Sequence, residues 1–151
     1  MTAMPSGRPI RCQGVRGAIS VAANTAAAIR EATHELLRTL VEANQIVAED
    51  IGGVFFTTTV DLTAEFPAVA ARELGWSDVA ILCGHEMNVP GALPMCLRVL
   101  LLWNTTRAPQ QIQHVYLREA QALRPDRAVN TPAWSALGHE SGRQRPGDNS
   151  T

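Results

Sequence analysis

The spacing of hydrophobic and polar residues predicts a domain in which strands alternate with two helices. Residues 10–21 form a mainly apolar run with two glycines around one arginine, and we expect a strand there. In the segment that follows, apolar residues recur at helical spacing and charged residues take the opposite face. We therefore predict a surface helix that is capped at Asn24 or Thr25, ends near Asn44 and packs one stripe on a sheet.

The same criteria predict five further elements. In chain order they are a β-branched and aromatic strand over 52–60, a short helix over 66–74 with Pro67 in its first turn, a strand over 78–83, a strand over 97–103, and a strand or short helix over 113–123. The third predicted strand is apolar on both faces, so we expect it to be buried, and we expect Gly84 to break it.

One folded domain is predicted over residues 10–127. Residues 1–9 are expected to form a flexible arm, and residues 128–151, which have few large apolar side chains, are expected to be disordered. Alternating strands and helices allow an α/β or an α+β fold, of which we predict α+β with a mixed sheet of about five strands and two main helices. Two helices cannot cover both faces of such a sheet, which favours self-association.

Composition removes several classes of function. The chain has 151 residues and a net charge of −1, so no nucleic-acid partner is expected. No apolar run approaches a membrane span and the N-terminus lacks a signal-peptide core, so we predict a cytoplasmic protein without membrane contact. All thirteen basic residues are arginines, which excludes Schiff-base catalysis by lysine and the phosphate-binding loop that ends in a lysine.

Cys83, His85 and Glu86 lie close enough in sequence to be considered as metal ligands. Neighbouring residues of a strand point to opposite faces, however, and the chain offers no second group of ligands. We therefore predict no metal site. The three cysteines are also too few and too widely spaced for a disulfide framework, which suits a reducing compartment.

Four polar residues stand out against their surroundings. Arg98 interrupts an apolar strand, so it either pairs with a structural carboxylate or awaits an anionic ligand. Arg16 lies between two glycines, which either let a ligand or another backbone approach or mark a bulge. Glu86 follows a strand end, and Tyr116 is the only tyrosine. The pattern indicates a pocket for a small, anionic, partly apolar molecule.

Six short segments carry a more specific signal through their order and spacing. They are Gly14-Val15-Arg16-Gly17-Ala18, Phe66-Pro67-Ala68 with Arg72-Glu73-Leu74, Cys83-Gly84-His85-Glu86-Met87, Cys96-Leu97-Arg98-Val99, His114-Val115-Tyr116-Leu117 and Leu123-Arg124-Pro125-Asp126. Together they resemble the AroH class of chorismate mutase over residues 10–127. Each segment is weak by itself, and the specificity comes from all six in register.

This resemblance implies a fold, an assembly and a reaction. The assembly is a mixed α/β homotrimer whose three sheets pack into a pseudo-α/β-barrel, with active sites at the subunit interfaces. The reaction is the Claisen rearrangement of chorismate to prephenate in the shikimate pathway of aromatic amino acid biosynthesis, and no cofactor or metal takes part. A unimolecular, pericyclic reaction needs no nucleophile or general base, so the enzyme contributes orientation and charge stabilisation.

The resemblance also implies catalytic roles, residue by residue. Arg98 would donate to the ether oxygen, a task that suits a permanently charged, forked donor. Arg16 would hold a substrate carboxylate, and Tyr116 would donate to a carboxylate. Glu86 would accept a hydrogen bond from the ring hydroxyl and balance the allylic side of the transition state.

Six further residues would bind the substrate by the same resemblance. They are Phe66 and Leu123 as apolar walls, Cys83 and the backbone of Leu82 as contacts, and Arg72 and Arg124 as charges that attract the dianion. Cys83 is expected to pack against the ligand rather than to attack it. Across a subunit interface we expect one set of residues to face Arg16, Tyr116 or the tail of a neighbour, and that set is Phe66, Arg72, Cys83, Glu86 and Arg98.

Two rival functions remain open from the sequence. An enamine/imine deaminase has a similar trimeric barrel with an arginine that holds a carboxylate, although the usual arginine-containing signature of that family near its C-terminal strand is not evident here. A non-catalytic sensor for an aromatic acid would keep the fold, although the presence of both Glu86 and Arg98 argues against it. Conversion of chorismate would distinguish all three.

Overall fold

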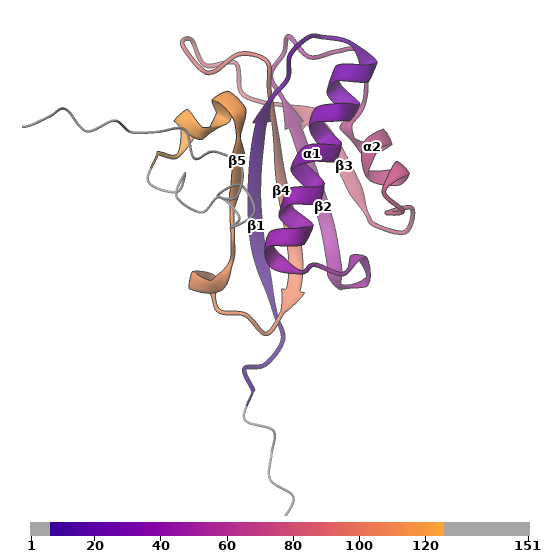
Figure 1. Ribbon diagram of the computed structural model, residues 1–151, viewed down its shortest axis with the longest axis vertical. Coiled ribbons are helices and arrows are strands. Elements are labelled where there is room, and N and C mark those ends of the chain that lie inside the picture. The colour runs from indigo at the N-terminus through magenta and orange to yellow at the C-terminus, as the bar shows by residue number, and fades with distance from the viewer. Residues whose placement is uncertain (1–6, 126–151) are drawn as a thin grey trace, which may run out of the picture.

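The computed structural model describes residues 7–125, which form a mixed five-stranded sheet with both α-helices on one face (Figure 1). The elements are β1 (Arg11–Ser20), α1 (Ala26–Asn44), β2 (Ile51–Thr58), α2 (Pro67–Glu73), β3 (Ile81–His85), β4 (Cys96–Thr105) and β5 (Val115–Leu117), with the 3₁₀ helices η1 (Ala48–Asp50), η2 (Pro109–Gln111) and η3 (Arg118–Leu123). The strand order is β3-β2-β4-β1-β5. The predicted α+β class, with a mixed sheet of five strands and two main helices, is confirmed.

The sheet is antiparallel at its centre and parallel at both edges. Strand β4 runs antiparallel to β1 and to β2, whereas β5 is parallel to β1 and β3 is parallel to β2. Because paired residues in neighbouring strands point to the same face, this register decides which side chains meet. It therefore separates a face that packs on the helices from a face that does not, which we call the open face.

Helix α1 forms where the apolar spacing predicts it. The Thr25 side chain caps its first turn by accepting a hydrogen bond from the backbone of Ala28, and Gln45 ends it in the left-handed conformation with φ 59°. Its apolar stripe packs against the sheet, with Ile29, Leu36, Leu37 and Leu40 fully buried and Val41 partly buried. A Cβ on Gly17 would come within 3.0 Å of side-chain atoms of both Leu36 and Leu40. Since β1 pairs with β4 without a bulge, the close approach of α1 explains this glycine.

The open face has little cover of its own. Phe55, Leu82 and Leu100 stand side by side on β2, β3 and β4, and all three are exposed. Helix η3 folds over one end of this face, where its Ala120 packs with Ala18 in a small apolar cluster. The expected shortage of helical cover is thus real, and it leaves an apolar surface of a kind that proteins usually bury.

Two local predictions were wrong or incomplete. The third strand is β3, an edge strand over Ile81–His85 rather than a buried strand over 78–83, and Gly84 lies inside it. It is apolar on both sides because Leu82 faces outward and is 63% exposed. The segment 113–123 contains both alternatives, since β5 is followed directly by the 3₁₀ helix η3.

Asn44 does more than end α1. Its side chain is fully buried, and its amide nitrogen donates to the backbone oxygens of Leu40 (3.0 Å) and Gln113 (2.9 Å). Its amide oxygen accepts a hydrogen bond of 2.8 Å from the backbone nitrogen of Gln113. One side chain therefore ties the end of α1 to the chain just before β5.

The predicted terminal segments fall largely outside the described residues. Residues 1–6 of the predicted arm and the whole predicted tail 128–151 lie outside them, and residues 7–9 have no regular secondary structure. Within residues 7–125, neither α1 nor α2 combines the length and the hydropathy that crossing a bilayer would take.

Candidate active site

A cavity of about 500 Å³ opens on the open face of the sheet. Its polar lining includes Arg16, Glu86, Arg98 and Tyr116, and its walls include Leu123 and Arg124. Strand register explains this convergence, because Ala18 of β1 pairs with Arg98 on one side and with Tyr116 on the other. The small Ala18 side chain leaves space between the two larger ones. All four predicted catalytic residues thus line one cavity.

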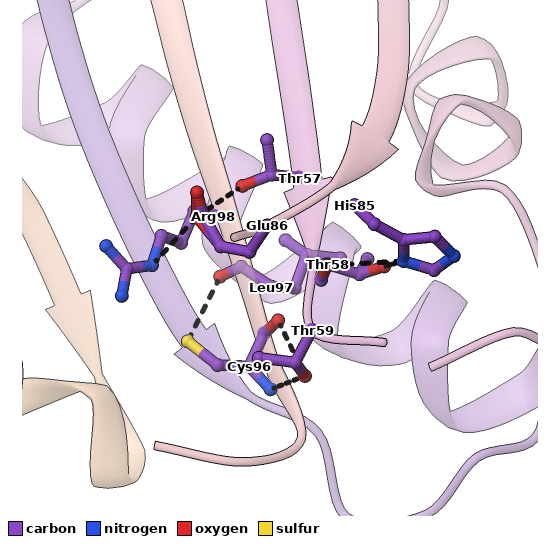
Figure 2. Close-up of polar contacts among 8 residues, drawn as sticks. All are labelled: Thr57, Thr58, Thr59, His85, Glu86, Cys96, Leu97 and Arg98. Carbon is purple, nitrogen blue, oxygen red and sulfur yellow. Dashed lines mark hydrogen bonds and ion pairs between the residues drawn. The ribbon is translucent and has the colours of Figure 1, made fainter. Parts of the chain in front are cut away.

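Arg98 lies in the wall of this cavity, at the base of the open face. Its Nε is buried and lies 3.4 Å from Oε2 of Glu86, an ion pair without hydrogen-bond geometry. Figure 2 shows the two terminal nitrogens of the guanidinium pointing away from Glu86. The side chain keeps 43% of its exposure. Of the two interpretations of Arg98, the structural carboxylate is present, and the outer side of the guanidinium still faces the cavity.

Glu86 is held at both its backbone and its side chain. Its backbone nitrogen donates to the carbonyl oxygen of Thr58 at 2.8 Å, and its Oε2 accepts a hydrogen bond of 3.0 Å from the Thr57 hydroxyl (Figure 2). The side chain is 30% exposed. A half-buried carboxylate beside a guanidinium offsets part of the cost of burying either charge.

The backbone of Arg16 is held by His114, a residue for which no role is predicted from the sequence. The backbone nitrogen of Arg16 donates to Nδ1 of His114 at 3.0 Å, and the imidazole is buried. A ring nitrogen that accepts this bond must be unprotonated, so the contact fixes the tautomer of His114. His114 belongs to the motif that contains Tyr116, but a contact 98 residues away in sequence leaves no local pattern.

A second, smaller cavity of about 300 Å³ lies between the start of α2 and the edge strand β3. Phe66 and Cys83 line it, and Phe66 is 69% exposed. Phe56 pairs with Cys83 on one side and Val99 on the other, so these side chains point toward the helices. Cys83 therefore lies on the opposite face of the sheet from Arg98.

Within one chain, the predicted site residues fall into two groups. Glu86 and Arg98 line the same cavity as Arg16 and Tyr116 within one chain, and they do not share a cavity with Phe66 and Cys83. The alternation of side chains along β3 and β4 causes this separation. The remaining predicted binding residues, Arg72 on α2 and Leu82 on β3, line neither cavity.

Cys83 has the properties of a packing residue. Burial raises the pKa of its thiol, and a hydrogen bond from the Ala68 backbone and the charge of Arg72 offset this only in part. A thiol with a raised pKa stays protonated at neutral pH and is a poor nucleophile.

We expect Cys83→Ser to retain substantial turnover for this reason. Its kcat should stay within about tenfold of the wild type, well short of the ~10²-fold loss expected when a charge donor is removed. Steady-state kinetics with chorismate, the substrate that the resemblance implies, measure this directly. A folded Cys83→Ser protein without any activity would show instead that the thiol takes part in the chemistry.

The sequence cluster around Cys83 and His85 is spread over two faces of the sheet. Nδ1 of His85 lies 3.2 Å from the Thr58 hydroxyl and 3.3 Å from the Thr58 carbonyl oxygen, on the helix-facing side (Figure 2). Glu86 turns toward the open face and contacts Thr57. Across residues 7–125, no three His, Cys, Asp or Glu side chains are grouped so that they could hold a metal ion.

Comparisons with known proteins agree on one family. The family model described as chorismate mutase type I matches residues 12–127. A protein named chorismate mutase AroH from Thermus thermophilus is 51% identical over 115 residues, which cover 76% of this chain and 94% of that protein. Its namesake from Bacillus subtilis is 42% identical over 115 residues, which cover 76% and 91%. A solved chorismate mutase from Clostridium thermocellum superposes with a TM-score of 0.72 at 43% identity, over 73% of this chain and 98% of that one.

Proposed function

Because this chain belongs to the chorismate mutase type I family and is a chorismate mutase, we propose that the charged cavity of its open face carries the reaction. The enzyme is an isomerase of aromatic amino acid biosynthesis that rearranges chorismate to prephenate. One observation gives the strongest support for placing the active site in this cavity. Arg16, Arg98, Tyr116 and Glu86 converge on a single cavity of about 500 Å³, in which two cations and a phenol can meet a dianion.

Arg98 is proposed to stabilise the transition state directly. Negative charge grows on the ether oxygen as the carbon–oxygen bond breaks, and a donor fixed in advance needs no reorganisation at that moment. The ion pair with Glu86 holds the Nε end of the guanidinium, so its outer nitrogens can serve the substrate. Glu86 would accept a hydrogen bond from the ring hydroxyl and face the allylic part of the transition state.

Arg16 and Tyr116 are proposed to bind the two carboxylates of chorismate. They project from neighbouring strands that pair in register, so the distance between them is set by the sheet. Leu123 and Arg124, from the end of η3 onward, would close the cavity with an apolar wall and a further positive charge. Holding the enolpyruvyl arm folded over the ring removes conformational freedom before the reaction begins.

The complete site is proposed to form between subunits of a homotrimer. Phe66 and Cys83 lie on the other side of the sheet from Arg98, so in one chain they cannot contact the same ligand. Packing a neighbour against the open face would bring its Phe66–Cys83 cavity to the charged cavity and cover the exposed Phe55, Leu82 and Leu100. The positive charge of Arg72 acts to lower the pKa of the Cys83 thiol. In the trimer, Arg72 would then lie at the mouth of the shared site.

Mixing two inactive variants tests whether the site is shared. Arg98→Ala would disable the charged half, and Arg72→Ala would remove the positive charge that the neighbour is proposed to place at the mouth, so each homotrimer should turn over slowly. In mixed trimers, random neighbours join two intact halves in one of four cases, so an equimolar mixture should regain about a quarter of the wild-type activity. Sedimentation equilibrium should give three copies of the chain. A mixture that stays as inactive as its components under conditions of subunit exchange would contradict a shared site.

Incubation with chorismate tests the function itself. Loss of the ultraviolet absorbance of chorismate, with acid treatment of the product yielding phenylpyruvate, is the expected result. Binding of chorismate without appearance of prephenate would favour the sensor instead. Absence of any loss at micromolar enzyme would favour the deaminase.

A cytoplasmic location is proposed as well. The three cysteines are all free thiols, one of them exposed at Cys12, which is compatible with a reducing compartment.

A further inference from the structure

We propose that Thr57 is a positioning residue that holds the carboxylate of Glu86 in its working orientation. The Thr57 hydroxyl donates to Oε2 of Glu86 at 3.0 Å, and Thr57 is itself the cross-strand partner of Arg98 (Figure 2). Thr57 lies in the lining of the charged cavity. The inference depends on the proposed role of Glu86 and extends it to a residue without charge.

Glu86 needs such a partner because its local structure leaves the side chain free to turn. It is the first residue after the edge strand β3, where its backbone is tied to β2 by a hydrogen bond from its nitrogen to the Thr58 carbonyl oxygen. The Arg98 ion pair is longer, at 3.4 Å, and lacks hydrogen-bond geometry. The Thr57 hydroxyl thus gives the Glu86 carboxylate a directional contact that Arg98 does not supply.

The geometry of Thr57 suits this task. Its β-branched side chain is stiff about χ1, and it sits inside a strand that is paired on both sides, so the hydroxyl has a defined position. It engages Oε2, the same oxygen that faces Arg98. Because Thr57 and Arg98 both meet Oε2, the other carboxylate oxygen, Oε1, is the one proposed to accept the hydrogen bond from the ring hydroxyl of the substrate.

Thr57→Val removes the hydroxyl and keeps the shape of the side chain. We expect kcat to fall about tenfold, since a misplaced carboxylate no longer meets the reacting geometry, while KM changes less than about threefold. Thr57→Ser restores the hydroxyl and should recover most of kcat. A purely structural role of Thr57 would instead lower the melting temperature and leave the serine variant no better than the valine variant.

A double-mutant cycle with Glu86→Gln shows whether Thr57 acts through the carboxylate. If it does, Thr57→Val should lower kcat by less than about twofold in the Glu86→Gln background, because the group that it positions is already gone. Thr105→Val is the matched control: Thr105 is a buried threonine at the far end of β4, and this change should leave kcat unaltered. Thr57→Ala replaces the valine variant if that protein does not fold.

Each outcome decides between the two hypotheses. Loss of kcat in Thr57→Val that is rescued by serine and absent in the Glu86→Gln background supports the positioning role. Equal losses in both backgrounds, or a fully active Thr57→Val enzyme beside an impaired Glu86→Gln enzyme, would overturn that role alone. A fully active Glu86→Gln enzyme would overturn the proposed role of Glu86, and with it the basis of the inference.

Discussion

Replacing Arg98 by alanine is expected to lower kcat at least ~10²-fold, the size of effect seen when one well-placed donor to a developing charge is lost. The alanine variant removes both the charge in the cavity and the partner of Glu86, which then lies half-buried beside an empty space. KM should rise less than kcat falls, because the interaction strengthens in the transition state. Steady-state kinetics with chorismate give both values.

Two further variants distinguish a loss of transition-state stabilisation by Arg98 from a general effect of removing an arginine. Arg107→Ala is the matched control, since Arg107 stacks over Trp103 at 5.3 Å and lines no part of the charged cavity. Arg98→Lys keeps the charge without the fork, and its activity should lie between alanine and wild type. An Arg98→Ala enzyme within a few-fold of wild type would show that another group meets the ether oxygen.

Asn44→Ala is expected to lower the free energy of unfolding by about 3 kcal/mol, since truncation strips buried hydrogen-bonding groups of their partners. The backbone nitrogen and oxygen of Gln113 both depend on the Asn44 side chain, which is fully buried. The same change loosens the chain that leads into β5 and Tyr116. Urea denaturation followed by circular dichroism measures the loss.

Asn24→Ala is the control for this prediction. Asn24 also makes three hydrogen bonds, to the backbone nitrogens of Thr63 and Ala64 and to the Thr63 hydroxyl, but it is exposed. Water can replace those partners, so the expected loss is only about 1 kcal/mol. Equal losses in the two variants would show that burial of Asn44 is not the cause.

Local sequence signals predicted the helices well because helix formation depends on nearby residues. Thr25, Asn44 and the apolar stripe of α1 all lie within one continuous segment, and the cap and the helix end are as expected. The third strand was misjudged since an apolar run does not distinguish a central strand from an edge strand. Whether Leu82 is buried depends on which strand lies beside β3, and that is a property of the whole sheet.

The candidate site also depends on contacts between distant strands, which local sequence signals do not show. Arg16, Glu86, Arg98 and Tyr116 were selected from their motifs, but the motifs do not show that all four line one cavity of a single chain, because that depends on register between distant strands. Thr57 and His114 were missed for a related reason. A threonine in a β-branched strand is an ordinary strand former, and its contact with Glu86 spans 29 residues.

The difference between the helix-packed face and the open face of the sheet also disfavours incorrect strand pairing. A shift of β4 by one residue against its neighbours would turn Arg98 under α1 and expel Leu97 and Val99 into water. A guanidinium placed in that apolar layer without a partner would be costly, because burying an unpaired charge is unfavourable. Arg98, which is proposed to stabilise the transition state, is thus also expected to disfavour slipped strand pairings while the chain folds.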